Sequence, residues 1–357
     1  MQRAQKDFFQ TGSEDFKAEL EAAGFERYRA GQISEAVFKK FVFDPREMPS
    51  IPKSLKDWLE KNWRFKAAKM VGEKSADDST RKYLFELEDG KFVESVLLKA
   101  PDGDGKTRKT LCISTQVGCA CSCRFCASGM RGFFRNLTAA EIVSQALPFA
   151  GETRGSAVSF EFENIVVMGM GEPLLNAKNL MSALETFNSP DKFGFGARRI
   201  TVSTCGIADE IERLAEAKFP FRLAISLHGA DDEVRSSIMP INKKYGLERL
   251  VAAAEKFSQN CGRMITLEYI LIKNVNDTFA QAGKLARIAK RLHAHVNLIP
   301  YNRVDGLEWR RSDAARRAAF AKILKAEGVS FTLRREKGAE IDAACGQLAL
   351  KRSSSQA

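Results

Sequence analysis

The chain has 357 residues, 44% of them hydrophobic, so it is long enough to bury a sizeable core. No apolar run approaches the roughly 18 residues that span a bilayer, and residues 1–16 lack a signal peptide's apolar stretch. We therefore expect a cytoplasmic protein without a membrane anchor. Eight cysteines are too sparse for a disulfide scaffold, and their crowding between residues 119 and 126 favours metal or redox chemistry in a reducing compartment.

The net charge of +11 comes almost entirely from residues 101–357. This distribution fits both a nucleic-acid substrate, whose phosphates basic residues would neutralise, and an ordinary solvated surface. Charge alone does not separate the two. The basic pairs in this region are Arg198-Arg199, Lys243-Lys244, Arg310-Arg311 and Arg334-Arg335.

Two segments precede the region of the cysteines. Residues 1–66 predict a helical accessory domain, with short amphipathic segments and with Trp58 and Trp63 in its core. Residues 67–104 predict a linking hairpin, whose two strands are joined by a turn at Asp89-Gly90.

Residues 105–350 alternate between short β-branched runs and segments of helical periodicity, which predicts an α/β fold with a parallel sheet. Six or so strand-helix units would curl into a barrel or partial (β/α) barrel, with ligands at the carboxyl ends of the strands. Residues 351–357 predict a disordered tail. The candidate strands are TLCIST, NIVVMGM, RITVST, RLAISLH, MITLEYILI, HVNLIPY and VSFTLRR.

The strongest chemical signal follows the first of these strands. Cys119, Cys123 and Cys126 form C-x-x-x-C-x-x-C, a spacing that lets one loop place three thiolates around an iron-sulfur cluster and leave one iron open. The alternative, a closed zinc site, needs four ligands, and no second cysteine pair of the right spacing follows. Cys121 is out of this register, and we expect it to be a bystander thiol.

Two further patterns lie close to this loop in the sequence. Thr138-Ala-Ala-Glu141 is a capping box and predicts a helix start behind the cysteines. Met168–Pro173 is a Gly-rich turn after an apolar strand, where backbone can approach a ligand and Glu172 can accept an amino group. Such a turn, taken alone, is more often only a turn.

The cysteine spacing, with Phe125 before the last cysteine, resembles the radical S-adenosylmethionine (SAM) superfamily. The chain is more specifically similar to the RlmN group of rRNA adenine methyltransferases. This resemblance implies a radical SAM partial barrel, a 4Fe-4S cluster on Cys119, Cys123 and Cys126, and SAM at the open iron. It also implies methylation of carbon 2 of an adenosine in 23S rRNA, and in some bacteria of one in tRNA. The matching segments are CISTQVGCACSCRFCASG, FFRNLTAAEIVSQ, MGMGEPLLN, RRITVSTCG, AISLHGADDEVRSSIMPINKKY, NLIPYN and IDAACGQLA.

The resemblance also implies three catalytic residues. Cys345 would take a methyl group from one SAM, and a second SAM would yield the radical that activates this methyl group for addition to adenine. Cys112 would then resolve the protein-RNA adduct through a disulfide. Glu94 would accept a proton in the same step. Without the resemblance, we would expect the two cysteines to be small packed side chains and Glu94 to be a solvated residue on a strand.

The same resemblance implies a set of SAM contacts at or just after predicted strands, consistent with barrel physics. They are Gly171, Glu172, Ser203, Ser226, Leu227, His228 and Asn302. Cys205 and Cys261 have no partner motif, and we expect them to be isolated structural thiols.

Two other functions stay open. A Cfr-type enzyme would methylate carbon 8 of the same adenosine, although GMGEPLLN and NLIPYN favour the RlmN type. A non-catalytic Fe-S or RNA-binding protein would need neither Cys112 nor Cys345. We further expect an electron-donor protein such as flavodoxin as a partner, and a monomer.

Overall fold

The computed structural model describes residues 5–65, 68–101, 107–150, 160–334, 338, 341–344 and 346–348. Its main feature is a ten-stranded sheet in the order β14-β13-β12-β11-β10-β9-β6-β5-β4-β3. The two edge strands, β14 and β3, do not pair with each other, so the sheet curls without closing. The predicted partial barrel is confirmed. The strands are β3 (Ala68–Ser75), β4 (Arg81–Leu87), β5 (Phe92–Pro101), β6 (Thr107–Cys112), β9 (Asn164–Val167), β10 (Ile200–Thr204), β11 (Arg222–Ser226), β12 (Thr266–Leu271), β13 (His295–Pro300) and β14 (Phe331–Leu333).

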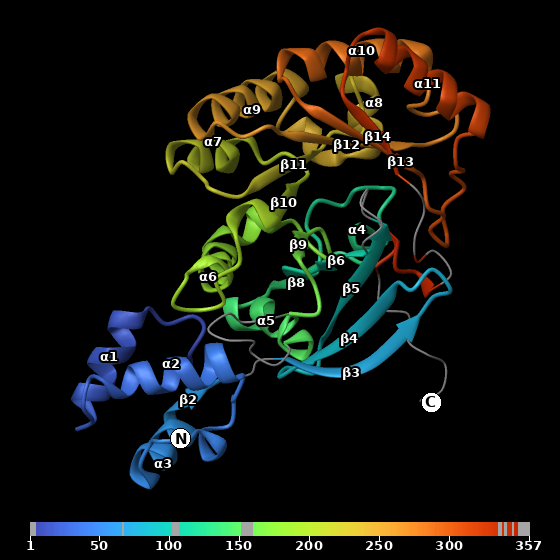
Figure 1. Ribbon diagram of the computed structural model, residues 1–357. Helices are drawn as coiled ribbons and strands as arrows, with labels where there is room; N and C mark the ends of the chain where they lie inside the picture. The colour runs from blue at the N-terminus through green and yellow to red at the C-terminus, as the bar shows by residue number, and fades with distance from the viewer. Residues whose placement is uncertain are drawn as a thin grey trace.

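In this sheet, β6 and the strands β9 to β14 run parallel, and helices connect them. Figure 1 shows these helices along the outer side of the sheet, as right-handed crossovers require. The carboxyl ends of the strands therefore open toward the concave side, where ligands bind in such folds. The helices are α6 (Ala177–Asn188), α7 (Ala208–Glu216), α8 (Asp232–Ile238), α9 (Leu247–Cys261), α10 (Phe279–Arg291) and α11 (Ala314–Ala326), and short 3-10 turns cover Pro45–Glu47, Leu147–Phe149, Pro173–Asn176, Ala197–Arg199 and Pro240–Lys243.

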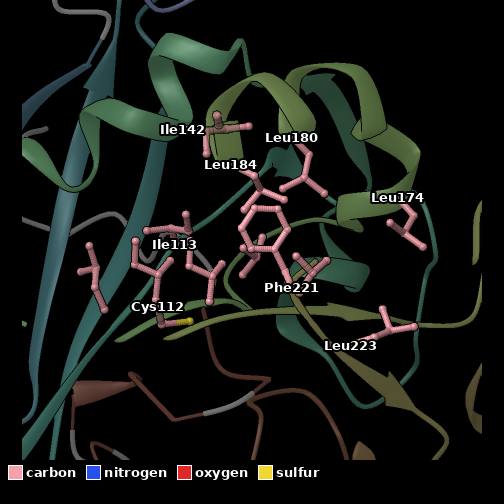
Figure 2. Close-up of a cluster of buried hydrophobic side chains, with 14 of the residues drawn as sticks. Cys112, Ile113, Ile142, Leu174, Leu180, Leu184, Phe221 and Leu223 are labelled. Atoms are coloured by element: carbon pink, nitrogen blue, oxygen red, sulfur yellow. The ribbon is translucent and has the colours of Figure 1, made fainter. Parts of the chain in front are cut away.

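Strand alternation decides which side chains face the barrel interior. On β6, Cys112 lines the interior, whereas Ile113, just after the strand, is fully buried on the helix side. Figure 2 shows Cys112 at the margin of an apolar cluster that contains Ile113, Ile142 and Leu184. A slip of one residue in this strand would turn the thiol into the core.

The strands predicted as a linking hairpin extend the barrel sheet. β4 and β5 pair antiparallel across the turn at Asp89-Gly90, where Gly90 has φ of +73°. β3 adds a third strand, and β5 pairs with β6, so the same sheet continues into the barrel. The division of the chain into domains stays a prediction, and residues 351–357 lie outside the described part.

The N-terminal helices gather beside the barrel (Figure 1). Trp63 is 2% exposed in their core and Trp58 is half-buried, so Trp63 fits the prediction better. Phe38 packs edge-on against Phe193, which follows α6, with ring centres 5.2 Å apart. No described helix is long and apolar enough to cross a membrane. The elements are α1 (Ser13–Ala22), α2 (Arg29–Lys40) and α3 (Lys53–Asn62), with β1 (Lys6–Asp7) paired to β2 (Trp63–Arg64).

A small second sheet frames the cysteine loop. β7 (Gln116–Gly118) pairs antiparallel with β8 (Phe133–Asn136), and α4 (Ala127–Met130) lies between them in the chain. The predicted capping box is confirmed at the start of α5 (Ala139–Ser144), where Thr138 accepts from the Glu141 backbone and Glu141 accepts from the Thr138 backbone.

Candidate functional site

A cavity of about 410 Å³ lies inside the partial barrel and collects most of the predicted site residues. Leu227 is buried but is not part of its wall, and neither is Glu94. Cys345 lies outside the described residues, although Ala344 and Gly346 on either side of it line the cavity. The predicted residues that line it are Cys112, Cys119, Cys123, Cys126, Gly171, Glu172, Ser203, Ser226, His228 and Asn302.

Backbone contacts fix the shape of the cysteine loop. The Cys119 N–H donates to the carbonyl of Gly132 at 2.9 Å, and the Cys126 N–H donates to that of Cys123 at 3.1 Å. Gly118 has φ of +77°, and a Cβ there would lie 1.9 Å from the Gly132 oxygen. Only glycine lets these two backbones approach so closely.

The thiols of the motif lie near one another, with Cys123 buried and Cys119 and Cys126 half-buried. Burial is the main cause that raises the pKa of Cys123, and the neighbouring thiols of Cys126, Cys121 and Cys119 raise it further. Burial likewise raises the pKa of Cys126. A bound metal cluster would remove this cost, because thiolates are its ligands and lose their protons on binding. The residues therefore fit an iron-sulfur cluster.

Cys205 is isolated in the sequence but has a partner thiol in the structure. Its Sγ lies 3.1 Å from the Sγ of Cys121, and both thiols lie within 4.8 Å of a carboxylate oxygen of Glu172. The two cysteines are 84 residues apart, so no local motif could have indicated this pair.

Backbone hydrogen bonds hold the Glu172 carboxylate in one orientation. One oxygen accepts from the Leu174 N–H at 3.0 Å and the other from the Cys205 N–H at 2.7 Å. Burial raises the pKa of Glu172 and these bonds lower it. At Gly171, φ is +100° and a Cβ would lie 2.5 Å from that of Gln116, so the turn requires glycine. A buried, oriented carboxylate of this kind suits a ligand ammonium group.

His228 is a neutral hydrogen-bond donor in this cavity. Burial lowers its pKa to about 3, so the ring is uncharged near pH 7. Its Nδ1 accepts from the Ile270 N–H at 3.1 Å, which leaves the proton on Nε2. The ring packs edge-on against Phe125 of the cysteine loop, with centres 4.8 Å apart.

Arg235 connects the loops that carry these groups, and sequence reasoning missed it. Its side chain is fully buried and donates to the carbonyls of Cys205 at 2.6 Å and Leu227 at 3.1 Å. It also donates to Asn242 Oδ1 at 2.6 Å. A basic residue in a charged segment normally predicts a solvated side chain, so no signal marked it.

The C-terminal segment is tied to the cysteine loop. The Ala127 N–H donates to the Gly346 carbonyl at 2.8 Å, and Ser128 Oγ donates to the Leu348 carbonyl at 2.5 Å. Lys82 links the same segment to Glu94. Its ammonium group forms an ion pair with Glu94 and donates to the Asp342 carbonyl at 3.3 Å. The first two contacts place Gly346 and Leu348 beside the cysteine loop, and the third places Asp342 near Glu94.

Four arginines line the cavity near the amino ends of the barrel strands, away from the cysteine loop. We call this set the arginine rim: Arg108, Arg198, Arg199 and Arg222. All four are exposed, and none forms an ion pair with a described residue. Of the predicted basic pairs, Arg198-Arg199 belongs to this wall, whereas Lys243-Lys244 and Arg310-Arg311 do not. In the fourth pair, Arg334 lines the cavity and Arg335 lies outside the described residues.

Comparison with known proteins gives a consistent result. Residues 113–286 match the Radical SAM superfamily. The chain is 51% identical over 346 residues to the probable dual-specificity RNA methyltransferase RlmN 3 of Opitutus terrae, covering 95% of this chain and 92% of that one. It is 45% identical to the corresponding RlmN of Akkermansia muciniphila, covering 95% and 94%.

A solved structure is similar over the same length. A radical SAM methyltransferase from Sphaerobacter thermophilus superposes with a TM-score of 0.88 at 40% identity, covering 96% of this chain and 98% of that one. The similarity therefore extends beyond the barrel to the N-terminal helices.

Proposed function

Because this chain belongs to the RlmN family of radical SAM RNA methyltransferases, we propose that it methylates carbon 2 of an adenosine in 23S rRNA, with the methyl group carried on Cys345. The observation that supports this most is the composition of one cavity. Its wall combines Cys112, the three motif cysteines, Glu172 and both neighbours of Cys345.

The chain uses a 4Fe-4S cluster and SAM. Cys119, Cys123 and Cys126 would hold the cluster, and the cluster and SAM together would supply the electron and the radical that an electrophilic adenine carbon requires. Glu172 would bind the amino group of SAM, since its carboxylate is fixed by two backbone donors. His228 would donate from Nε2 to SAM, and Ser203, Ser226 and Asn302 would add polar contacts.

The remaining steps belong to the protein's own thiols and carboxylate. Cys345 would carry the methyl group and form the covalent link to the base. Cys112, which faces the same cavity, would then form a disulfide with Cys345 and release the methylated RNA. The family resemblance gives Glu94 the role of accepting the proton that leaves carbon 2; it does not line the cavity, and burial raises the pKa of its carboxyl.

The arginine rim would hold the RNA backbone. Arginines that form no ion pair with a described residue suit phosphates, and their position leaves the cysteine end of the cavity for a splayed-out base. The relatives' names include dual specificity, so we propose a tRNA adenosine as a second substrate. Flavodoxin as electron donor, the monomeric state and a cytoplasmic location remain proposals of the same kind.

The test is the identity of the product. Anaerobically reconstituted enzyme, protein-free 23S rRNA, SAM and a reductant should give 2-methyladenosine, identified by chromatographic retention and fragment mass against both methyladenosine standards. Product eluting as 8-methyladenosine would assign the Cfr-type reaction instead. A methyl group on the exocyclic nitrogen would contradict the radical mechanism.

A further inference from the structure

A buried carboxylate in the cavity has no role in the function proposed above. Glu268, on β12, is 4% exposed and lines the cavity. Its Oε1 accepts a hydrogen bond from Asn297 Nδ2 at 2.9 Å. Its Oε2 is buried and accepts no hydrogen bond from a described residue. An acceptor left in this state costs free energy that a bound ligand's donor would recover.

The position of Glu268 separates it from the cluster end of the cavity. It pairs in register with Ser226, the last residue of β11, while its backbone oxygen accepts from His228 N at 3.3 Å. Ile270, two residues later on the same side of β12, contacts the His228 ring through its N–H. Glu268 therefore lies level with Ser226 and one pleat below His228, toward the amino ends of the strands where the arginine rim lies.

The charges around Glu268 favour a neutral donor as its partner. Burial raises the pKa of Glu268, and the positive charge of Arg334, at the end of β14, lowers it. A ligand ammonium would find its carboxylate at Glu172 instead, which already faces the cysteine loop. Two kinds of ligand group could then donate a hydrogen bond to Glu268 Oε2: the amino group of a base, or a ribose hydroxyl.

We propose that Glu268 Oε2 accepts a hydrogen bond from the exocyclic amino group of the target adenine, so that Glu268 selects adenosine. This inference rests on the proposed function and specifies how its substrate is recognised. Adenine carries a donor at carbon 6, whereas guanine and hypoxanthine carry an acceptor there. With guanine or hypoxanthine, the oxygen on carbon 6 would face Glu268 Oε2, and neither acceptor would receive a hydrogen bond. Glu268 would therefore reject guanosine and inosine.

The test uses three RNAs that differ only at the target position, which carries adenosine, inosine or purine riboside, a base without the amino group. Wild-type enzyme should prefer adenosine over purine riboside by about 10- to 100-fold in kcat/KM. Glu268→Ala should lose this preference. Glu268→Gln should shift preference toward inosine, because Asn297 holds the amide oxygen and turns the new NH₂ toward the base.

The dissociation constants of the three RNAs are also measured and compared, because binding can be followed whether or not methylation occurs. Absence of 2-methyladenosine with wild type would overturn the proposed function, whereas unchanged base selectivity in both variants would overturn the role of Glu268. Weaker SAM binding with unchanged selectivity would assign Oε2 to a SAM ribose hydroxyl. Glu233→Gln, at an exposed carboxylate on α8, is the matched control and should change none of these ratios.

Discussion

Lys82 Nζ lies 3.1 Å from Glu94 Oε1, and both side chains are nearly buried. Burial is the main cause that raises the pKa of Glu94, and Lys82 is the main group that lowers it. Glu94 is thus a carboxylate whose pKa is raised by burial and lowered mainly by Lys82, with a smaller effect from Arg131, which suits a proton acceptor.

Removing that cation should raise the pKa of Glu94 further. A base works only when deprotonated, so its activity is lost as pH falls through its pKa, and a higher pKa moves this loss to higher pH. Lys82→Met should therefore shift the acid limb of the single-turnover methylation rate upward in pH. Lys74→Met, on exposed β3, is the control. An acid limb that stays in place in Lys82→Met would remove Glu94 from the proton transfer.

The cysteine register has a direct metal test. Anaerobically purified protein should contain about four irons and four sulfides per chain, and Cys123→Ala should lose them. Cys121→Ala should keep them, because Cys121 contacts Cys205 and lies outside the three-ligand spacing. Equal loss of iron in both variants would reopen the ligand assignment, and stoichiometric zinc in place of iron would contradict it.

Replacing Arg235 should lower both the free energy of unfolding and the affinity for SAM. Arg235→Met leaves the Cys205 and Leu227 carbonyls without their buried donor, which should cost about 3 kcal/mol in the free energy of unfolding. Denaturant unfolding and SAM affinity measure the two effects. Arg235→Lys should not restore either, because an ammonium cannot reproduce the planar fork. Arg213→Met, at an exposed arginine, should be near neutral.

The arginine rim should act through phosphates. Arg222→Ala should weaken RNA binding similarly for all sequences and reduce the slope of log affinity against log salt by about 1. Arg213→Ala removes an equal charge from an exposed site outside the cavity and should leave the slope unchanged. An unchanged slope in Arg222→Ala would place the RNA backbone elsewhere.

Features carried by local patterns could be predicted from the sequence. The apolar run NIVV became β9, the turn at Asp89-Gly90 formed, and the Thr138 cap formed with both of its hydrogen bonds. Each depends on residues a few positions apart, so propensity and spacing were sufficient. The cysteine motif belongs to this group, since one short loop carries all three thiols.

Features that depend on distant contacts could not be predicted. Nothing near Cys205 indicates that it meets Cys121, and the charge of Arg235 suggests solvent rather than full burial. Glu268 sits in an apolar strand whose pattern shows that it faces inward but not that one oxygen lacks a partner. The roles of Cys112, Glu94 and Cys345 came from resemblance alone, because isolated thiols and a single strand carboxylate have no local signature.

The most direct test of the two-thiol account is a denaturing gel of Cys112→Ala protein made in cells or reacted with RNA and SAM. The account predicts a nuclease-sensitive covalent RNA adduct, because Cys345 can form the link but nothing can resolve it. Cys345→Ala and the double variant should carry no RNA, and Cys345→Ala should cleave SAM slowly without methylating. Cys112→Ala protein free of RNA, together with methylation by Cys345→Ala, would contradict the account.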